Sequence, residues 1–245
     1  MATSYQEIKP DQASAAPKKE QVATMFNHIA GRYDFMNRFL SMGIDKGWRR
    51  RAIKELEGRS IDQLLDVATG TGDFALQALT LNPGHITGID ISEGMLEVGR
   101  RKIAANNLQE KITLQVGDSE NILFADNSFD AVTVAFGVRN FQELDRGLAE
   151  IFRVLKPGGK LVILEFSKPK KFPVKQFYGF YFKYILPLWG KLLGGSSSAY
   201  SYLPASVRAF PEGVKFLEYM QEAGFRQLLC KPLSFGICSI YSGTK

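Results

Sequence analysis

Short apolar runs alternate with segments of helical periodicity through the middle of the chain. In the helical segments apolar residues recur every three or four positions, while the runs between them have the character of buried strands. This alternation predicts a mostly parallel sheet with helices on both faces. The expected strands span residues 64–66, 85–90, 112–116, 129–136 and 160–166, and the expected helices between them span residues 74–81, 92–106 and 144–155.

The N-terminal part of the chain precedes the first expected strand. Residues 1–19 are polar and contain two prolines, a composition typical of a disordered tail. From Glu20 onward apolar residues return at helical spacing, and Asp45 is a candidate N-cap for a further helix. We therefore expect helices over residues 20–57, which either cover a substrate or fill out the core.

The C-terminal part supplies the last two expected strands. Pro211 opens a helix, and residues 226–232 and 235–241 have the pattern of a β-hairpin. The whole pattern predicts an α/β fold with a seven-stranded, mostly parallel sheet whose last strand is antiparallel. We expect a single domain over residues 20–245, without an internal repeat.

Residues 172–193 differ from the rest of the chain, because aromatic side chains and lysines are interspersed there at high density. We expect a helical insertion after the fifth strand, so that residues 170–210 complete a cover over the substrate. Aromatic rings and lysines in this arrangement sit at the headgroup level of a membrane, and the arginines at 49–51 add attraction to anionic lipid. A solvated basic face over a pocket explains the same pattern, and both can hold. Lys183 and Pro187 argue against a membrane span.

The turn after the first strand carries the strongest chemical signal. Apolar residues run up to Asp66, and Gly70 and Gly72 follow in a turn that leads into a helix. Glycine lets a ligand approach the backbone closely, and a strand, turn and helix of this kind binds the nucleoside part of a cofactor. Asp90 ends the next strand, where a carboxylate accepts hydrogen bonds from ribose hydroxyls. Capping of the helix near Ser92 is the other explanation for Asp90.

The acids around this turn discriminate between two classes of cofactor. A dinucleotide brings phosphates to the turn, and Asp73 would repel them. S-adenosylmethionine has no phosphate and carries sulfonium and ammonium groups, which Asp73 and Asp66 attract. Electrostatics therefore favours S-adenosylmethionine. Asp118 and Ser119 follow the third strand, where a carboxylate reaches the adenine amine, although a solvated turn is also consistent with them.

Composition and charge bear on the partners, the cellular location and the metal content of the protein. The net charge of +6 and the pI near 9.2 fit a nucleic acid, an anionic membrane surface or no charged partner at all. No apolar run reaches the length of a transmembrane helix and no secretory signal is recognised, so we expect a cytoplasmic location. Cys230 and Cys238 have a spacing that fits neither a zinc site nor a disulfide framework, and we expect no metal.

Seven stretches of the chain resemble known families. Three are similar to class I S-adenosylmethionine-dependent methyltransferases: DVATGTGD from Asp66, GIDISEGML from Gly88 and RVLKPGGK from Arg153. Four resemble the C-methyltransferases of menaquinone and ubiquinone biosynthesis: YDFMN from Tyr33, FGVRNF from Phe136, LEFSKP from Leu164 and YSYLPASVRAFP from Tyr200. The resemblance covers the chain from about residue 20 to the end.

This resemblance implies a Rossmann-like fold and methyl transfer to a ring carbon of a prenylated quinol. It also implies that Thr71, Asp90, Asp118 and Ser119 bind the cofactor. Ala135 stands where the family often has a serine, so we assign no cofactor contact to that position.

Methyl transfer to carbon needs an electron-rich carbon, and ionisation of a quinol hydroxyl supplies one. We expect Arg139 and Asn140, on the loop after the fourth strand, to bind that oxygen. An arginine stabilises a developing phenolate or holds a water that takes the proton. Tyr33 and Asp34 are expected on the substrate side, with ordinary packing as the alternative. His28 is either a helix-surface residue or a general base.

Three classes of function follow. The first is a demethylmenaquinol C-methyltransferase, or a dual enzyme that also methylates a benzoquinol of the ubiquinone pathway. The second is a methyltransferase for another small molecule or for RNA, although the chain lacks the Asn/Asp-Pro-Pro-Tyr/Phe signature. The third is a scaffold that binds cofactor or lipid without chemistry, against which the intact Gly70, Gly72 and Asp90 argue. We expect a prenylated quinol and a membrane surface as partners and no nucleic acid, and we leave a homodimer open.

Overall fold

The computed structural model describes residues 8–41, 43–181, 184 and 197–245. The remainder of the predicted insertion, residues 182–183 and 185–196, lies outside the described part, as do residues 1–7. The helices are α1 (Lys18–Leu40), α2 (Ile44–Ile53), α3 (Asp73–Ala78), α4 (Glu93–Ala105), α5 (Leu144–Val154), α6 (Val174–Phe180), α8 (Ser197–Ala209) and α9 (Val214–Glu222). The strands are β1 (Gln63–Val67), β2 (His85–Asp90), β3 (Ile112–Val116), β4 (Phe129–Ala135), β5 (Leu155–Phe166), β6 (Arg226–Leu233) and β7 (Cys238–Thr244).

The seven strands form one sheet in the order β3-β2-β1-β4-β5-β7-β6. Neighbours from β3 to β5 are parallel, whereas β7 pairs antiparallel with both β5 and β6. The predicted fold class is therefore confirmed, including the antiparallel last strand and the terminal hairpin.

Helices cover both faces of the sheet, as the strand composition requires. On one face, buried residues of α2, α3 and α4 pack against the sheet, among them Trp48, Phe74 and Leu96. On the other face, α5 and α9 supply Leu148 and Phe216. The central strands β1 and β4 are buried along most of their length and are for this reason mainly apolar, whereas the edge strand β3 alternates buried and exposed residues.

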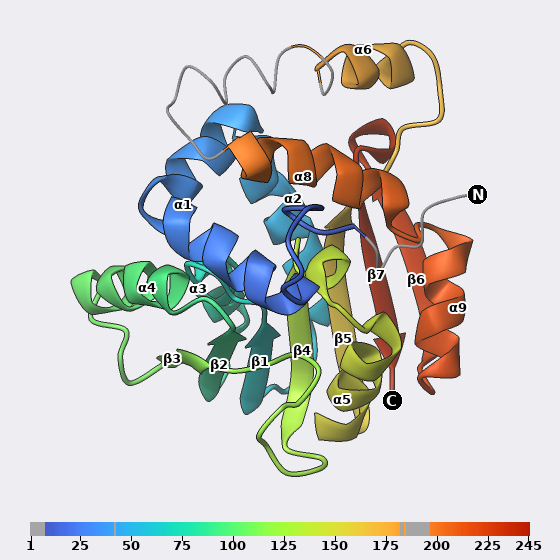
Figure 1. The fold of residues 1–245 in the computed structure, drawn as a ribbon. Helices are drawn as coiled ribbons and strands as arrows, with labels where there is room; N and C mark the ends of the chain where they lie inside the picture. The colour runs from blue at the N-terminus through green and yellow to red at the C-terminus, as the bar shows by residue number, and fades with distance from the viewer. Residues whose placement is uncertain (1–7, 42, 182–183, 185–196) are drawn as a thin grey trace.

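The order of the strands creates a ligand crevice at one edge of the sheet. The chain moves outward from β1 to β3 and then crosses to β4, so the connections after β1 and β4 diverge at their carboxyl ends. Such a switch point is where open α/β sheets bind ligands. In Figure 1, α1 and α8 lie across this edge and α6 lies above α8.

Several boundaries differ from those expected, among them the starts of α9 (Val214) and β7 (Cys238), each three residues later than expected. The first helix begins at Lys18, inside the stretch expected as a tail. Gly43, with φ 76°, occupies the N-cap position of α2, so the prediction of an Asp45 cap is wrong. β5 begins at Leu155 because residues 156–159 form an irregularity in the pairing with β4 instead of ending an element. The division into a tail and a domain otherwise stays a prediction.

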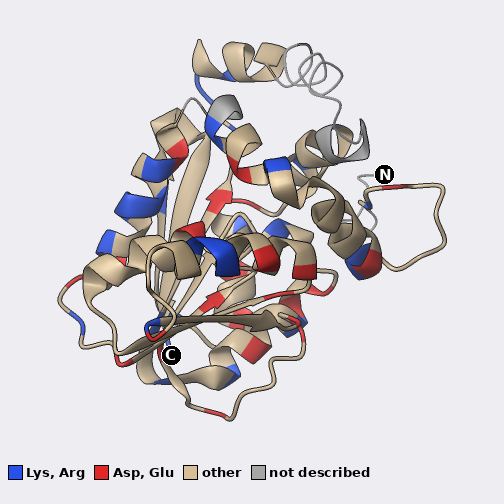
Figure 2. Ribbon diagram, turned by 90° about the vertical axis from the view of Figure 1, so that its left-hand side faces the viewer, with Lys and Arg blue, Asp and Glu red and all other residues tan. Residues whose placement is uncertain are grey.

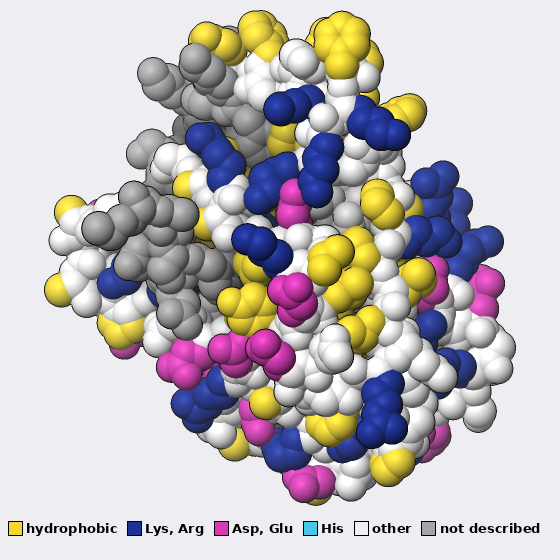
Figure 3. Space-filling view, turned by 90° about the vertical axis from the view of Figure 1, so that its right-hand side faces the viewer, with side chains coloured by type: hydrophobic (Ala, Val, Ile, Leu, Met, Phe, Trp, Pro, Cys, Tyr) yellow, Lys and Arg dark blue, Asp and Glu magenta, His cyan; other side chains and the backbone are white. Residues whose placement is uncertain are grey.

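The surface carries both charges. In Figure 2, acidic and basic residues are interspersed over the side that it shows, so the positive net charge is not gathered there. Figure 3 shows hydrophobic side chains at the top of the opposite side, over α6, with lysines and arginines directly beneath. Among the described residues, no helix combines the length and apolar character needed to cross a bilayer.

Candidate active site

The backbone at the carboxyl ends of β1 and β4 takes a left-handed conformation. Ala68 has φ 53° and Phe136 has φ 58°, values that residues with a Cβ rarely adopt. Gly137 lets the two turns approach each other, because a Cβ at this position would lie 2.6 Å from the Cβ of Ala68. Backbone strain of this kind is concentrated at functional sites. The two turns therefore mark the edge of the sheet where a ligand is expected.

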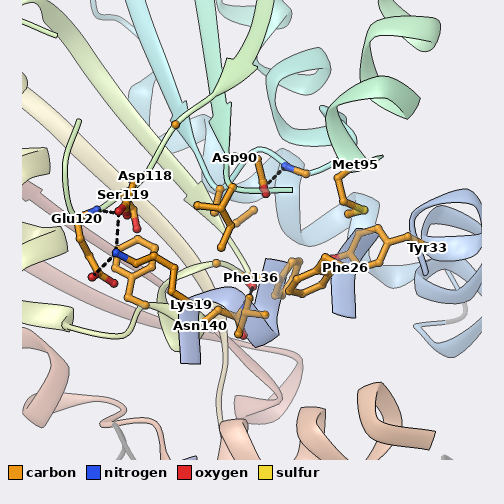
Figure 4. A pocket seen from close by; sticks show the side chains of 18 residues that line it. Lys19, Phe26, Tyr33, Asp90, Met95, Asp118, Ser119, Glu120, Phe136 and Asn140 are labelled. Carbon is orange, nitrogen blue, oxygen red and sulfur yellow. Dashed lines mark hydrogen bonds and ion pairs between the residues drawn. The ribbon is translucent and has the colours of Figure 1, made fainter. Parts of the chain in front are cut away.

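A polar cavity lies at this edge, between the strand ends and α1 (Figure 4). In Figure 4, Asp118 and Glu120 lie at one end of the cavity, Tyr33 lies at the other end, and Asp90 lies between them. The structure thus brings together six of the predicted site residues, Tyr33, Gly70, Asp90, Asp118, Ser119 and Asn140.

Asp90 lines the cavity with its carboxylate held in place. The backbone N–H groups of Gly70 and Ser92 each donate to it at 2.8 Å. Burial raises the pKa of Asp90, although these donors lower it. A carboxylate has further lone pairs that can accept ribose hydroxyls. The hydroxyl of Ser92 caps α4 by accepting from the N–H of Met95 at 3.3 Å, so capping and ligand binding are served by different side chains.

Lys19, at the start of α1, closes the acidic end of the polar cavity. Its Nζ lies 2.7 Å from Asp118 Oδ2 and 2.8 Å from Glu120 Oε2. Lys19 therefore already occupies one oxygen of the carboxylate that we expected at the adenine. The second oxygen of Asp118 accepts from the N–H of Glu120 at 2.9 Å.

Lys18 fastens the same end of α1 to the loop after β4. It is 1% exposed, and its Nζ donates to the carbonyl oxygens of Phe141 at 2.9 Å and Arg139 at 3.3 Å. Burial lowers the pKa of Lys18 to about 7, although the charge of Glu120 acts in the opposite direction. We call Lys18 and Lys19, with these contacts, the lysine clasp.

Three residues predicted to bind the cofactor lie outside the lining of both cavities: Asp66, Thr71 and Gly72. Asp66 is fully buried and accepts from the hydroxyls of Thr69 at 2.6 Å and Thr133 at 2.7 Å. Burial raises its pKa to about 6, against the effect of these hydrogen bonds. In this structure Asp66 holds β1, β4 and the turn together.

Thr71 belongs to an ion network beneath the turn. Its hydroxyl donates to Asp34 at 2.6 Å, and Lys102 lies 2.5 Å from Asp34 and 2.6 Å from Asp73. Arg49 lies 3.8 Å from Asp73. Asp34 thus ties α1 to the turn and does not line either cavity, and two cations balance Asp73. The effect of Asp73 on the choice of cofactor is therefore smaller than its charge alone predicts. Arg49 is buried and is not available to lipid.

A second, aromatic cavity of about 350 Å³ adjoins the polar cavity. Phe26, Tyr33 and Phe136 line both cavities, so the two meet at three aromatic rings. The wall of the aromatic cavity comes from α1, α2, α6, α8 and the ends of β4 and β5, and includes Met25, Trp48, Arg139, Phe166, Phe177, Tyr178, Tyr181 and Tyr202. The described part of the predicted cover, α1 together with α6 and α8, thus encloses an apolar space.

Arg139, in the loop after Phe136, is one of two arginines in the wall of the aromatic cavity, and the other, Arg49, lies 5.8 Å from the centre of the Phe136 ring. The Nη1 of Arg139 donates to Glu165 Oε1 at 2.8 Å and to the carbonyl oxygen of Phe136. The guanidinium also lies 5.5 Å from the centre of the Phe166 ring. Burial lowers the pKa of Arg139, but the charge of Glu165 and its hydrogen bond to the guanidinium act in the opposite direction, and the net pKa is raised. Arg139 therefore stays cationic in an apolar wall.

Sequence reasoning missed three contributors to the site. Glu165 could have been found, because an acid at the end of a buried strand requires a cationic partner. Lys18 and Tyr202 gave no comparable signal, since their partners lie far away in the sequence. His28 is exposed on α1 and lines neither cavity, so the general-base alternative is wrong.

The fold is that of the class I S-adenosylmethionine-dependent methyltransferases. A solved S-adenosylmethionine-dependent methyltransferase from Thermotoga maritima has a TM-score of 0.64 and 21% identity, over 91% of this chain and 99% of that one. The [4+2]-cyclase SpnF has a TM-score of 0.70 and 18% identity, over 95% and 97% of the two chains. Because a cyclase shares the architecture, the fold alone does not set the reaction.

Sequence similarity identifies the family. Residues 14–245 match the model of the ubiE/COQ5 methyltransferase family, and the chain belongs to this family. A demethylmenaquinone methyltransferase of Bacteroides fragilis is 50% identical over 98% of both chains. The ubiquinone/menaquinone biosynthesis C-methyltransferase UbiE of Geotalea daltonii is 47% identical over 93% of this chain and 97% of its own. The chain is accordingly a methyltransferase with S-adenosylmethionine as its cofactor.

The polar cavity fits this cofactor. Asp90 presents acceptors, Met95 and Phe141 add apolar surface, and Gly70 leaves the backbone open to close approach. The side-chain oxygen of Asn140 is buried without a hydrogen-bond partner among the described residues, and Asn140 lines this cavity. A buried acceptor of this kind is suited to the ammonium group of the cofactor.

Proposed function

We propose that this protein transfers a methyl group from S-adenosylmethionine to a ring carbon of a prenylated quinol, converting demethylmenaquinol to menaquinol. The main support is the junction of the two cavities, where Phe26, Tyr33 and Phe136 line both. A cofactor in the polar cavity and a ring in the aromatic cavity therefore meet across these side chains. The names of the relatives from Bacteroides fragilis and Geotalea daltonii support the same substrate class.

The proposed mechanism depends on charge next to the ring. When bound, S-adenosylmethionine supplies an electrophilic methyl group. A quinol hydroxyl ionises by releasing its proton to solvent, and Arg139, held by Glu165, stabilises the resulting negative charge, which raises the nucleophilicity of the ring carbon. The ring carbon that gains the methyl group releases its hydrogen as a proton to solvent, which restores the aromatic ring. Asn140 belongs to the same loop but faces the polar cavity, so the loop aligns the two reactants.

The aromatic residues orient the ring and exclude water. The ring centres of Phe136 and Phe166 lie 4.5 Å apart, and the ring centre of Trp48 lies 6.2 Å from that of Phe166, with the two rings edge to face. The indole N–H of Trp48 donates to the hydroxyl of Ser234 at 2.8 Å, which fixes its orientation. Burial raises the pKa of Tyr33, so its phenol stays protonated at the junction. A dry, apolar wall strengthens the interaction between Arg139 and the quinol oxygen.

An assay with paired substrates tests this function. Purified protein and S-adenosylmethionine are incubated with a short-chain demethylnaphthoquinol and with a polyprenyl-methoxybenzoquinol, each supplied reduced and oxidised. We expect methylation of the reduced naphthoquinol only. Turnover of both quinols would establish the dual enzyme, and equal turnover of the oxidised naphthoquinone would contradict the ionised-ring mechanism.

We further propose that α6 touches the membrane that holds the substrate. Phe172 is 80% exposed and Phe180 is 56% exposed, while Lys170, Lys171 and Lys175 are exposed beside them (Figure 3). Rings of this kind insert at the headgroup level and the lysines attract anionic lipid. Phe177 and Tyr178 of the same helix line the aromatic cavity, so contact at α6 brings the cavity to the lipid. With the cytoplasmic location expected from the sequence, we propose that the protein acts at the cytoplasmic face of the membrane, and the homodimer stays a prediction.

Vesicle flotation tests the membrane contact. The double variant Phe172→Ser/Phe180→Ser should lose binding to anionic vesicles, because neither side chain lines a cavity and both are exposed. Leu123→Ser is the matched control, since Leu123 is 81% exposed and lies outside α6. Equal flotation of the double variant and the control would reject α6 as the contact.

A further inference from the structure

Two buried hydrogen-bond donors face the aromatic cavity without a protein acceptor. Tyr202, on α8, is 3% exposed, and Arg139 is 5% exposed. The Tyr202 hydroxyl and the Arg139 Nε have no hydrogen-bond partner among the described residues. Both residues line the aromatic cavity. Because a buried donor without an acceptor costs free energy, groups of this kind in a native site call for an explanation.

The remaining contacts of these residues show that the two donors are held in place. Arg139 is fixed through Nη1 by Glu165 and Phe136, so its Nε is the atom left over. The ring of Tyr202 packs with Val22 and Met25 of α1. α8 contacts the short helix Val138–Asn140, which carries Arg139. The hydroxyl is therefore positioned by apolar packing, with no hydrogen bond of its own within the described residues.

The two groups are electrostatically coupled. Burial raises the pKa of Tyr202, and the positive charge of Arg139 acts against this rise. A negative charge on Tyr202 would in turn raise the pKa of Arg139. At neutral pH the phenol is protonated, and it is available as a donor beside a permanent cation.

We propose that Tyr202 and the Nε of Arg139 together bind one ring oxygen of the substrate. Two unpartnered donors in the wall of one cavity select an atom with two free lone pairs and reject a ligand that presents an N–H group to them. A quinol oxygen, neutral or ionised, satisfies this requirement. The assignment rests on the proposed quinol substrate. It gives the YSYLPASVRAFP stretch a role in substrate recognition, as the segment that delivers a phenol to the aromatic cavity.

The variant Tyr202→Phe tests the assignment, because it removes only the hydroxyl. We expect kcat/KM for the reduced naphthoquinol to fall by about 10- to 100-fold, the usual cost of losing a hydrogen bond to a buried polar group. Cofactor affinity by calorimetry should be unchanged. The melting temperature should be unchanged or higher, since the hydroxyl forms no hydrogen bond with a described residue.

Tyr241→Phe is the matched control. Tyr241 is fully buried and lines neither cavity, and its hydroxyl accepts from the N–H of Gly213 at 2.9 Å. This variant should lower the melting temperature and leave kcat/KM unchanged. The opposite responses of the two variants separate recognition of the substrate from stability of the fold.

Inhibition by two mono-hydroxy analogues, each a naphthol that lacks one quinol oxygen, completes the experiment. Tyr202→Phe should raise the inhibition constant of the analogue that keeps the contacted oxygen. It should leave the inhibition constant of the analogue that lacks this oxygen unchanged. Equal inhibition constants of the wild type and Tyr202→Phe for both analogues would overturn the assignment, as would unchanged turnover of the quinol. A wild type that binds these analogues but never methylates the quinol would instead refute the proposed function and leave the binding result to decide the role of Tyr202.

Discussion

The polar cavity and the aromatic cavity satisfy their buried polar groups differently. In the polar cavity the carboxylates already have partners: Asp90 accepts two backbone N–H groups, and Asp118 is paired with Lys19. In the aromatic cavity Arg139 and Tyr202 each keep a donor without an acceptor among the described residues. The carboxylates of the polar cavity are thus held by the protein, which leaves the Asn140 oxygen for a ligand, whereas the aromatic cavity keeps two donors for its ligand. Substitutions in the polar cavity should therefore affect cofactor affinity, and substitutions in the aromatic cavity should affect turnover.

The largest expected effect comes from Arg139→Ala. Loss of the cation that stabilises the quinol oxygen should lower kcat by about 10²- to 10³-fold. Cofactor affinity should change little, because Arg139 does not line the polar cavity. The measurement is steady-state turnover with calorimetry of cofactor binding. A loss confined to cofactor affinity would show that Arg139 serves the polar cavity.

Removal of Arg139 also leaves Glu165 buried without its cation. An unpaired buried charge typically costs about 3–5 kcal/mol of folding free energy. The double variant Arg139→Ala/Glu165→Gln serves as the control, because it removes both charges. We expect it to recover stability in denaturant unfolding without recovering turnover.

Asp90→Asn should have the next largest effect, and this effect should be on cofactor binding in the polar cavity. The amide loses acceptor capacity towards the ribose and disturbs the N–H donors of Gly70 and Ser92. We expect the dissociation constant of S-adenosylmethionine to rise by about 10- to 100-fold. The KM for the quinol, measured at saturating cofactor, should stay unchanged. A change in quinol KM alone would contradict the division between the two cavities.

Lys18→Met tests the attachment of α1, the helix that lines both cavities. The readout is the pH dependence of the free energy of unfolding. The pKa of Lys18 is lowered to about 7 in the folded protein, while the unfolded chain keeps a pKa near 10.5. Between these values the unfolded state binds more protons, so this group makes the free energy of unfolding rise with pH, by at most about 1.4 kcal/mol per unit. The variant lacks this contribution.

The stability of wild type minus that of Lys18→Met should therefore increase from pH 7 to pH 10 in denaturant unfolding. Below pH 7 the difference should be constant, because both states are protonated there. A difference that does not vary with pH would show that the ammonium of Lys18 is not desolvated.

The smallest effect is expected from Thr71→Val. Thr71 was predicted to bind the cofactor, but its hydroxyl here contacts Asp34 and Lys102. Loss of these hydrogen bonds should lower stability by about 1–3 kcal/mol. Cofactor affinity should fall far less than in Asp90→Asn. Comparable losses of cofactor affinity in the two variants would show that Thr71 contacts the cofactor, as the sequence predicted.

The sequence predicted best those features that are set by local pattern. β2 and β3 have the expected bounds, because each is a short segment rich in β-branched residues that ends at an acid or is followed by a glycine. The start of β5 was missed, since Lys156-Pro-Gly-Gly159 has the composition of a turn but lies within an irregular pairing. α8 lies within the helical cover expected over residues 170–210, but its bounds were not predicted, because Pro204 lies inside it. Local composition thus gives the elements and misleads where tertiary pairing overrides it.

For the site, the residues at strand ends could be predicted and their neighbours could not. Parallel strands place Gly70, Asp90 and Asp118 at one edge whatever else the chain does. The clasp and Tyr202 depend on how α1 and α8 cross that edge, which no local pattern encodes. The acids near the glycine turn gave the right cofactor, although Asp73 is neutralised by partners that only the structure reveals.

The lysine clasp also has a consequence for the order of folding. Lys18 leaves the ribosome early, but its carbonyl partners at Arg139 and Phe141 lie 121 and 123 residues further along the chain. Contacts at such separation form late, because the intervening loop must first be closed by other structure. We therefore expect the first turn of α1 to be fastened only after β4 and its loop exist, although Asp34 ties the later part of α1 to the turn after β1. The Lys18 end of the polar cavity is then among the last parts of the nascent protein to be assembled.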